Sequence, residues 1–438
     1  MAARASIAAV LLAVLLGYVY NVYLQRLLLV TGAFRQPGST ELASGDFMVI
    51  ESTLHCEDLH YHDSTGLIFT ACEGFRGSRL KWFPPIDHFF EPSNPGLHKG
   101  NLQIIDPKTF KAQVLELEGF SGPFVTHGID VIDDPEKPKG EAVYIFAVNH
   151  RPNPKHYGEN GDVNAPRSYS VVELFRHVVG SGKASHIRTI WHPLITTPND
   201  ILAISPTSFL VTNDHYFRTG FLRALEDITT LITRTNTVHV QLQDLKPVED
   251  DDSGVHASVA LDKLHNLNGI GHGRTEDEVF VTGCGSGLMH VGKILEGKEA
   301  EKFINVSKTI EFGIPIDNPT YFKDPYANKT FDASGVVASG PTRAVDWMKN
   351  KAMESVIDPS MVWMASPRFS GQKGEGAAKG EEDWDVKVIF QDDGQRVRTA
   401  SASVLLAIDP KEEQGRRRAW LFVSSYHSYN VIAAKIDL

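Results

Sequence analysis

The chain has 438 residues and an ordinary globular composition, with 42% hydrophobic and 22% charged side chains. This composition supports a large buried core and argues against disorder. The formal net charge is -11 at pH 7, and Lys and Arg form no clustered stripe, so the sequence argues against a nucleic-acid partner. Length alone does not divide the chain, since some β folds use more than about 200 residues as one unit.

The N-terminus carries a membrane-directed segment. Ile7 to Leu24 is apolar except for Asn21, with Arg4 before it and Arg26 after it. This stretch approaches the roughly 20 residues that span a bilayer, although its inner part also fits the hydrophobic region of a signal peptide. Thr31-Gly32-Ala33 is a possible cleavage site. We expect residues 1–35 to be a signal-anchor segment and stem, retained rather than cleaved, with the body luminal, extracellular or secreted.

Two glycosylation sequons support this location. Asn305 begins Asn305-Val306-Ser307, and Asn328 begins Asn328-Lys329-Thr330. Both asparagines are predicted to carry glycans if the chain enters the secretory pathway. Such tripeptides also arise by chance, so they add weight only beside the N-terminal segment.

The chain has three cysteines, Cys56, Cys72 and Cys284. The segment between the first two is typical of a strand, a turn and a strand, and a hairpin centred on Ser64 would set Cys56 opposite Cys72. We predict a disulfide there and an unpaired Cys284. Two reduced core thiols are the alternative.

Past residue 45 the sequence predicts a mainly β body, because short β-branched or aromatic runs alternate with turn residues. The runs are Phe47–Ile50, Leu67–Ala71, Leu102–Ile105, Ala142–Val148, Val171–Val178, Ser208–Thr212, Val238–Leu242, Glu278–Thr282, Val386–Phe390, Ser403–Ile408, Trp420–Ser424 and Val431–Ile436. Helical spacing is limited to Phe221–Leu231, Gly292–Ile304 and Thr342–Met353.

This pattern admits a sandwich, a barrel or a propeller. Runs this short and numerous favour radial repetition, because large sheets must split or curl. Two stretches rich in loop residues, Pro152–Arg167 and Ser366–Asp385, are predicted to be insertions rather than domain linkers. We therefore expect residues 36–438 to form a single domain.

Adjacent oxygen-bearing pairs offer hard ligands for a cation. These pairs are Glu57-Asp58, Asn199-Asp200 and Asp317-Asn318, and Asn268 stands in a similar context. Neighbouring residues on a strand point to opposite faces, so one pair at the axis of a radial fold can serve two stacked cation sites. Such dipeptides are also common in turns, where they bond their own backbone.

Several blocks, in order from Cys56 to the C-terminus, resemble the serum paraoxonase/arylesterase family. The most characteristic stretch is Asn199-Asp200-Ile201-Leu202-Ala203-Ile204 followed by Thr212-Asn213-Asp214-His215-Tyr216-Phe217. The others are Cys56-Glu57-Asp58-Leu59, His127-Gly128-Ile129, Val148-Asn149-His150, Val172-Glu173-Leu174-Phe175, Asn268-Gly269-Ile270 and Asp317-Asn318.

The resemblance implies a six-bladed β-propeller with two calcium ions in its central tunnel. Carried over by position, the catalytic ion would be held by Glu57, Asn199, Asn268, Asp317 and Asn318. The structural ion would be held by Asp58, Asp200 and the main-chain carbonyl of Ile129. Each set contributes two carboxylates, so each dication would be about neutralised. All-oxygen ligation disfavours zinc.

The activity implied is hydrolysis of carboxylic esters or lactones, with Ca²⁺ polarising the carbonyl and a His dyad activating water. His127 would be the base and His150 its orienting partner, whereas His215 is predicted to pack or to anchor a loop. The family also carries a disulfide between its terminal strands, but Val431–Leu438 contains no cysteine. We therefore expect strand pairing to close the ring.

Two alternatives share the propeller fold. One is a lactonase of the gluconolactonase or strictosidine-synthase-like type, which would hold a single metal ion. The other is a calcium-stabilised propeller that binds a partner without catalysis. No Gly-x-Ser-x-Gly elbow is present in the sequence, which disfavours a serine-nucleophile hydrolase, and Gly283–Gly287 lacks the ending of a phosphate loop.

Overall fold

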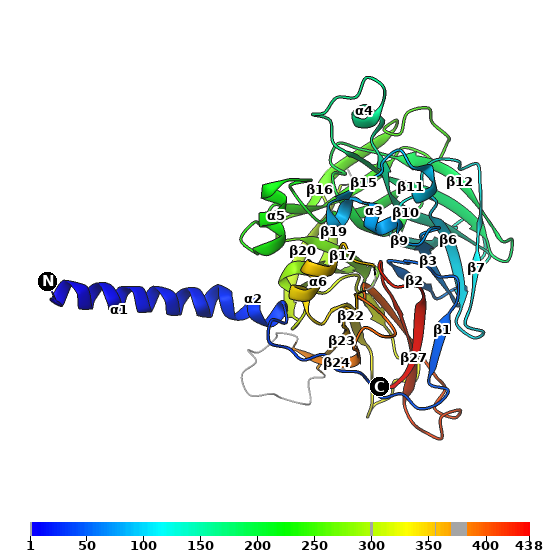
Figure 1. The fold of residues 1–438 in the computed structure, drawn as a ribbon. Helices are drawn as coiled ribbons and strands as arrows, with labels where there is room; N and C mark the ends of the chain where they lie inside the picture. Colours follow the sequence, from blue (N-terminus) through cyan, green and yellow to red (C-terminus); the bar gives the residue numbers. More distant parts are fainter. Residues whose placement is uncertain (1, 298–300, 355, 369–382) are drawn as a thin grey trace.

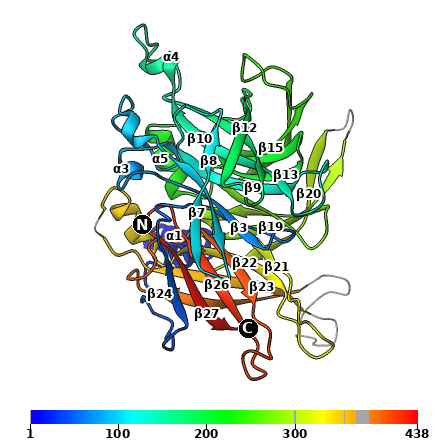
Figure 2. The same ribbon diagram turned by 90° about the vertical axis from the view of Figure 1, so that its right-hand side faces the viewer.

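The structure is a computed structural model that describes residues 2–297, 301–354, 356–368 and 383–438. Six blade-like sheets surround a central axis, and a long helix projects from one side of the body (Figure 1). A view at right angles shows the sheets spread around the molecule, with both ends of the body's chain in neighbouring strands (Figure 2). The all-β, six-bladed propeller expected from the sequence is confirmed.

Each blade is an antiparallel sheet of four strands in chain order, with two exceptions described below, and β4 (Trp82–Phe83) and β5 (His88–Phe89) lie outside the blades. The strands are β2 (Leu59–His62), β3 (Leu67–Cys72), β6 (Asn101–Asp106) and β7 (Lys111–Val114); β9 (Thr126–Asp133), β10 (Ala142–Pro152), β11 (Ser168–Val178) and β12 (Lys183–Ile190); β13 (Pro198–Ser205), β14 (Ser208–Asn213), β15 (Thr235–Leu242) and β16 (Val255–Leu264); β17 (Leu267–His272), β18 (Glu278–Gly283), β19 (Leu288–Glu296) and β20 (Lys302–Glu311); β21 (Thr320–Phe322), β22 (Gly335–Pro341), β23 (Ser360–Pro367) and β24 (Trp384–Asp392); and β25 (Ala402–Ala407), β26 (Arg418–Ser424), β27 (Val431–Asp437) and β1 (Phe47–Ile50).

The first exception is β8 (Glu116–Glu118), which pairs in parallel with β12 as a fifth strand. The second closes the ring: β1 pairs antiparallel with β27, from Phe47 opposite Ala434 to Ile50 opposite Val431. The last blade thus takes strands from both ends of the body. The expectation that strand pairing, without a disulfide, closes the ring is confirmed.

Apolar side chains on both faces of the blades pack between neighbouring blades and form the core. One cluster joins the β10 blade to the β13 blade through Phe146 and Phe209, and another joins the β22 blade to the closing blade through Val362 and Leu421. The six innermost strands, β2, β9, β13, β17, β21 and β25, contact one another around the axis. Polar residues at the starts of these strands therefore meet at the centre of the molecule.

Carboxylates link these inner strands from blade to blade. Asp58 on the approach to β2 accepts from the N–H of Ile129 on β9 at 3.0 Å, and Asp130 on β9 accepts from the N–H of Ala203 on β13 at 2.6 Å. Asp200 on β13 continues the pattern by accepting from the N–H of Ile270 on β17 at 2.8 Å. Half of the ring is thus fixed by buried, backbone-bonded aspartates.

Glycine permits this close approach. A Cβ atom on Gly128 would lie 2.5 Å from the main-chain oxygen of Asn199, and one on Gly269 would lie 2.6 Å from the Cα of Asn318. Any side chain at either position would push the inner strands apart. The glycines that follow His127 and Asn268 are therefore packing requirements of the axis.

The disulfide between Cys56 and Cys72 is present, and Cys284 is free, as predicted. The bond ties the segment before β2 to the end of β3, so it fixes the chain next to Glu57 and Asp58. The predicted turn at Gly283–Gly287 contains a short 3-10 helix, η4 (Cys284–Ser286), between β18 and β19.

One predicted helix is wrong. Gly292–Ile304 spans the end of β19 and the start of β20, where Gly292 lies opposite Val306 and Ile294 opposite Ile304. Its Lys- and Glu-rich sequence has good helix propensity, but its apolar residues pack against the neighbouring blade, and tertiary pairing overrides propensity. The other two helices are confirmed as α5 (Phe221–Ile228) and α6 (Ala344–Asn350).

The remaining helices are short except at the N-terminus. They are α3 (Ser78–Lys81), α4 (Pro154–Tyr157) and the 3-10 turns η2 (Pro84–Ile86) and η3 (Pro95–Leu97), while β4 (Trp82–Phe83) and β5 (His88–Phe89) form a small ribbon. The predicted insertion at 152–167 contains α4, and most of that at 366–385 falls outside the described residues.

The N-terminal segment forms α1 (Ala2–Val19), a π-helical turn η1 (Tyr20–Leu24) and α2 (Gln25–Val30), which continue as one rod that points away from the propeller (Figure 1). Leu11, Leu12 and Leu15 on α1 are exposed. None of the helices among the described residues meets the length and hydropathy needed to cross a membrane.

Candidate metal centre and active-site cavity

Four of the five residues expected to hold a catalytic ion line one cavity of about 380 Å³, and they come from four different parts of the ring. Glu57 precedes β2, Asn199 lies on β13, Asn268 on β17, and Asp317 precedes β21. The fifth, Asn318, donates from its amide to Glu57 Oε1 at 3.0 Å. The radial fold thus collects residues that are up to 261 positions apart in sequence.

Each of these five side chains holds a buried oxygen without a partner. Within the described residues, these oxygens are Glu57 Oε2, Asn199 Oδ1, Asn268 Oδ1, Asp317 Oδ1 and Asn318 Oδ1. An unpaired polar atom in a protein interior costs about 1–3 kcal/mol. Four of these residues line one cavity and the fifth, Asn318, contacts Glu57, so the set favours a ligand with positive charge. Carboxylate and amide oxygens are the ligands that Ca²⁺ takes.

The carboxylates themselves are electrostatically strained without a cation. Burial, then the charges of Asp317 and Asp58, raise the pKa of Glu57 well above its usual value. Burial and the charges of Asp58 and Asp214 likewise raise the pKa of Asp317. A bound divalent cation would reverse both effects, because it favours the ionised carboxylates.

No group of three or more His, Cys, Asp or Glu side chains that could hold a metal is present in the part of the chain described. The candidate set differs in kind, because it consists of two carboxylates and three amides. Its chemistry fits an oxygen-ligated cation and does not fit zinc.

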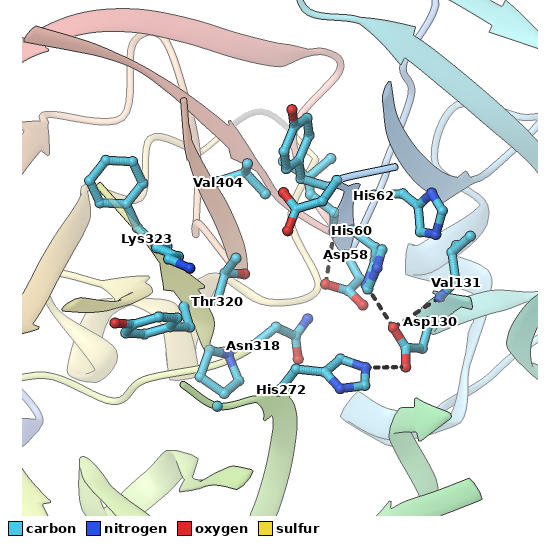
Figure 3. A pocket seen from close by; sticks show the side chains of 18 of the residues that line it. Asp58, His60, His62, Asp130, Val131, His272, Asn318, Thr320, Lys323 and Val404 are labelled. Carbon is cyan, nitrogen blue, oxygen red and sulfur yellow. Dashed lines mark hydrogen bonds and ion pairs between the residues drawn. The ribbon is translucent and has the colours of Figure 1, made fainter. Parts of the chain in front are cut away.

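Asp58, Asp200 and Ile129 face the opposite end of the axis. They line a second cavity, of about 760 Å³, which also includes Asn318 (Figure 3). The two residues of each adjacent pair therefore line different cavities. Glu57 and Asn199 line the first cavity, and Asp58 and Asp200 line the second. Burial raises the pKa of Asp58 to about 6, although backbone N–H groups of Ile129 and Leu59 oppose the shift.

Figure 3 also shows a cluster that the sequence did not reveal. Asp130 lies between His60 and His272, with its Oδ1 2.7 Å from His60 Nδ1 and its Oδ2 2.8 Å from His272 Nε2. Its carboxylate also accepts backbone N–H groups of Val131 and Ala203. Asp130 on β9 therefore links its blade to those of β2, β13 and β17 through contacts within the protein.

The two histidines expected to form a dyad are in contact. His127 Nδ1 lies 3.1 Å from His150 Nε2, and His150 Nδ1 lies 2.9 Å from the hydroxyl of Ser170. His127 lines the first cavity together with Glu57 and Asn199. Burial and the neighbouring His150 hold the pKa of His127 well below its usual value, and burial lowers the pKa of His150 to about 3. Both rings are therefore neutral at pH 7.

His215 also lies on this cavity. Its Nδ1 is 2.9 Å from Asp214 Oδ1, and its Nε2 is 2.8 Å from Asp227 on α5. Burial and Arg223 act to lower the pKa of His215, but the carboxylates of Asp214 and Asp227 outweigh them and raise it. This contact ties α5 to the cavity wall, and His215 is at the same time part of the cavity lining.

A buried ion pair contacts the histidine pair through the ring of Phe83. Arg79 is fully buried, lies 3.5 Å from Glu73 and stacks over the ring of Phe83. The Phe83 ring contacts the His127 ring edge-on, at 5.1 Å between centroids. The sequence did not predict this contact between Arg79, Glu73 and Phe83, because residues 73–83 have the composition of a surface turn.

Comparisons with known proteins identify the family to which the chain is similar. The family model described as Arylesterase matches residues 74–327. Serum paraoxonase/arylesterase 2 of Rattus norvegicus is 29% identical over 240 residues, which cover 54% of this chain and 56% of the relative. The Gallus gallus protein of the same name is 35% identical over 176 residues (40% and 43%), and that of Homo sapiens is 28% identical over 240 residues (54% and 56%).

The chain thus spans about half the length of the curated relatives it matches. The family model covers more than half of this chain, including the His127–His150 pair, Asn199, Asn268 and Asp317. The chain belongs to the arylesterase family.

Proposed function

We propose that the protein is a calcium-dependent hydrolase of carboxylic esters and lactones. The observation that carries the proposal is a set of five unpartnered buried oxygens, four of them on residues that line one cavity with His127, which contacts His150. Membership of the arylesterase family supports the same reaction class.

Glu57, Asn199, Asn268, Asp317 and Asn318 would hold the catalytic ion. Their two carboxylates balance the charge of Ca²⁺, and the amide oxygens supply further ligands toward the roughly 6–8 that it prefers. When bound there, Ca²⁺ would polarise the substrate carbonyl and stabilise the oxyanion. The protein's share is to orient these oxygens, and the bound ion would in turn favour the ionised form of the two carboxylates.

His127 would take the proton from the attacking water. A base must be neutral before it acts, and the lowered pKa of His127 meets that condition at pH 7. His150 would orient His127 through the 3.1 Å contact, and the Ser170 hydroxyl would hold His150 in turn. The proton then has a path away from the cavity through this pair.

Asp58, Asp200 and the carbonyl of Ile129 would hold a second, structural ion. Asp58 and Asp200 contribute two buried negative charges. Burial raises the pKa of Asp200, and the charge of Asp58 adds to this effect. A cation there would stabilise the junction of three inner strands without contacting the substrate.

We also infer a location in the secretory pathway, anchored at a membrane or secreted. Asn305 and Asn328 are exposed, as glycosylation requires, and a disulfide is present. Residues 1–35 would form the signal-anchor and stem, and residues 36–438 one catalytic domain.

Two variants separate the roles. Asp317→Ala is expected to fold and to keep the structural ion, but to lose binding of the catalytic ion and hydrolysis of phenyl acetate. His127→Asn is expected to keep calcium binding, measured by calorimetry, and to lose about 10²–10⁴-fold in kcat. Full hydrolysis by either variant would reject the proposal.

A further inference from the structure

The end of the N-terminal rod forms part of the cavity wall. Leu27 and Leu28 on α2, together with Thr31 and Ala33 just after it, line the same 380 Å³ cavity as Glu57 and His127. This part of the chain is remote from the propeller strands in sequence, and it was expected to be only a stem.

Two arginines attach this segment to loops beside the cavity. The guanidinium of Arg26 donates to the main-chain oxygens of Ser286 and Gly287, at 2.9 and 3.0 Å, and to the carboxylate of Glu311. The guanidinium of Arg35 donates to the main-chain oxygens of Thr342 and Gly313. Both ends of the segment are therefore fixed to the body.

The packing between these points is close. Val30 is only 1% exposed, and a Cβ on Gly287 would lie 3.3 Å from its side chain. Gly32 has a φ of +64°, and a Cβ there would lie 2.3 Å from the oxygen of Thr342. The main-chain oxygen of Thr31 also accepts from the N–H of Val345. The segment is thus seated as a part of the domain.

The cavity has a polar floor and a partly apolar upper wall. The candidate ion ligands form the floor. Leu27 and Leu28 belong to the rest of the lining with Ile228 of α5 and Trp347 and Met348 of α6, and α5 also contributes the charged Arg223, Glu226 and Asp227. These three helices lie on the side of the body from which α1 projects (Figure 1). A volume of about 380 Å³ is within the range of pockets that enclose small molecules.

We propose that Leu27 and Leu28 determine specificity by contacting the apolar chain of the substrate's acyl group. This inference rests on the proposed function for the identity of the reacting group, and it adds the N-terminal segment to the substrate site. A substrate whose carbonyl reaches the floor directs its alkyl chain toward the opposite wall, where burial of each methylene is favourable.

The test compares a Leu27→Ala/Leu28→Ala double variant with Leu29→Ala in the full chain. Leu29 is on the same helix, is 52% exposed and is not part of the cavity wall, so it controls for effects on α2 itself. The ratio of kcat/KM for phenyl octanoate to that for phenyl acetate is expected to fall about 10-fold or more in the double variant, the scale for lost methylene contacts. Leu29→Ala is expected to keep the ratio of the unmodified protein.

Binding of uncleavable anilides gives a readout that needs no catalysis. Octananilide is expected to bind more weakly to the double variant, with acetanilide binding and the melting temperature unchanged. Equal chain-length ratios in all three proteins, or an equal loss in Leu29→Ala, would overturn the inference. If the unmodified protein hydrolyses neither ester, the proposed function fails, and the anilide affinities alone decide whether Leu27 and Leu28 form a ligand wall.

Discussion

Replacing Glu57 by Gln tests whether the unpartnered oxygens exist to hold a cation. Glutamine has the same size and keeps an oxygen, but it removes one of the two negative charges of the set. If calcium is present at 100 times its Kd, its binding contributes about 2.7 kcal/mol of stability. For a chain of this length each kcal/mol is worth about 1–2 °C, by scaling the values for smaller domains, so the expected calcium shift from this site is about 3–5 °C.

In Glu57→Gln we expect most of this shift to disappear, while a smaller one from the Asp58–Asp200 group remains. Without calcium the variant should be at least as stable as the unmodified protein, because the substitution removes a buried carboxylate whose pKa is raised by burial and by the charges of Asp317 and Asp58. Thermal unfolding, followed with and without a chelator, measures both quantities.

Glu73→Gln is the matched control. Glu73 is an equally buried glutamate, but it is paired with Arg79 and accepts from the N–H of Thr126. Its loss leaves a buried cation without its partner, which costs about 3–5 kcal/mol whether or not calcium is present. The reasoning is refuted if Glu57→Gln destabilises the calcium-free protein as Glu73→Gln does, or if it leaves the calcium shift intact.

Three further outcomes are expected. The pKa of Asp58 is raised to about 6 in the folded protein. Protonation of Asp58 therefore stabilises the calcium-free folded state below the unfolded pKa of about 4, and this stabilisation is lost as pH rises through about 6. The increase in melting temperature caused by calcium should accordingly grow between these two pH values. A Cys56→Ser/Cys72→Ser variant, which opens a loop with a sequence separation of 16, should lose about 3 kcal/mol in denaturant unfolding, and an unchanged midpoint would contradict this. His150→Gln should lower kcat for phenyl acetate with little change in KM, since in the proposed mechanism His150 would position the base without contacting substrate; a changed KM alone would assign it to binding.

Each of the twelve runs that the sequence predicted as a strand falls on a strand of the structure, because short β-branched and aromatic runs mark them, but the described residues contain 27 strands. The resemblance carried by the ordered motifs implied the six-bladed ring. The alternation of side chains along a strand also indicated that the two members of Glu57-Asp58 and of Asn199-Asp200 could serve different sites, and in each pair the two members line different cavities. The prediction failed at Gly292–Ile304, where pairing within a blade overrides the helix propensity of Lys and Glu.

Other parts of the site left no local signal. The contact of Arg79 with Glu73 and Phe83, and the links formed by Asp130, depend on which blades lie side by side. Leu27 and Leu28 belong to an apolar run whose composition indicates a membrane-directed helix, and only its attachment through Arg26 and Arg35 brings it to the cavity. Long-range packing, which periodicity does not encode, decides all three.

The central claim is that bound calcium makes this cavity a hydrolytic site. The most direct measurement is hydrolysis of phenyl acetate and of a medium-chain lactone by the full chain, before and after a chelator, and again after calcium is restored. The account predicts activity that chelation removes and that calcium, but not magnesium, returns. Hydrolysis that persists in the chelator, or a folded, calcium-binding protein that cleaves neither substrate, would contradict it.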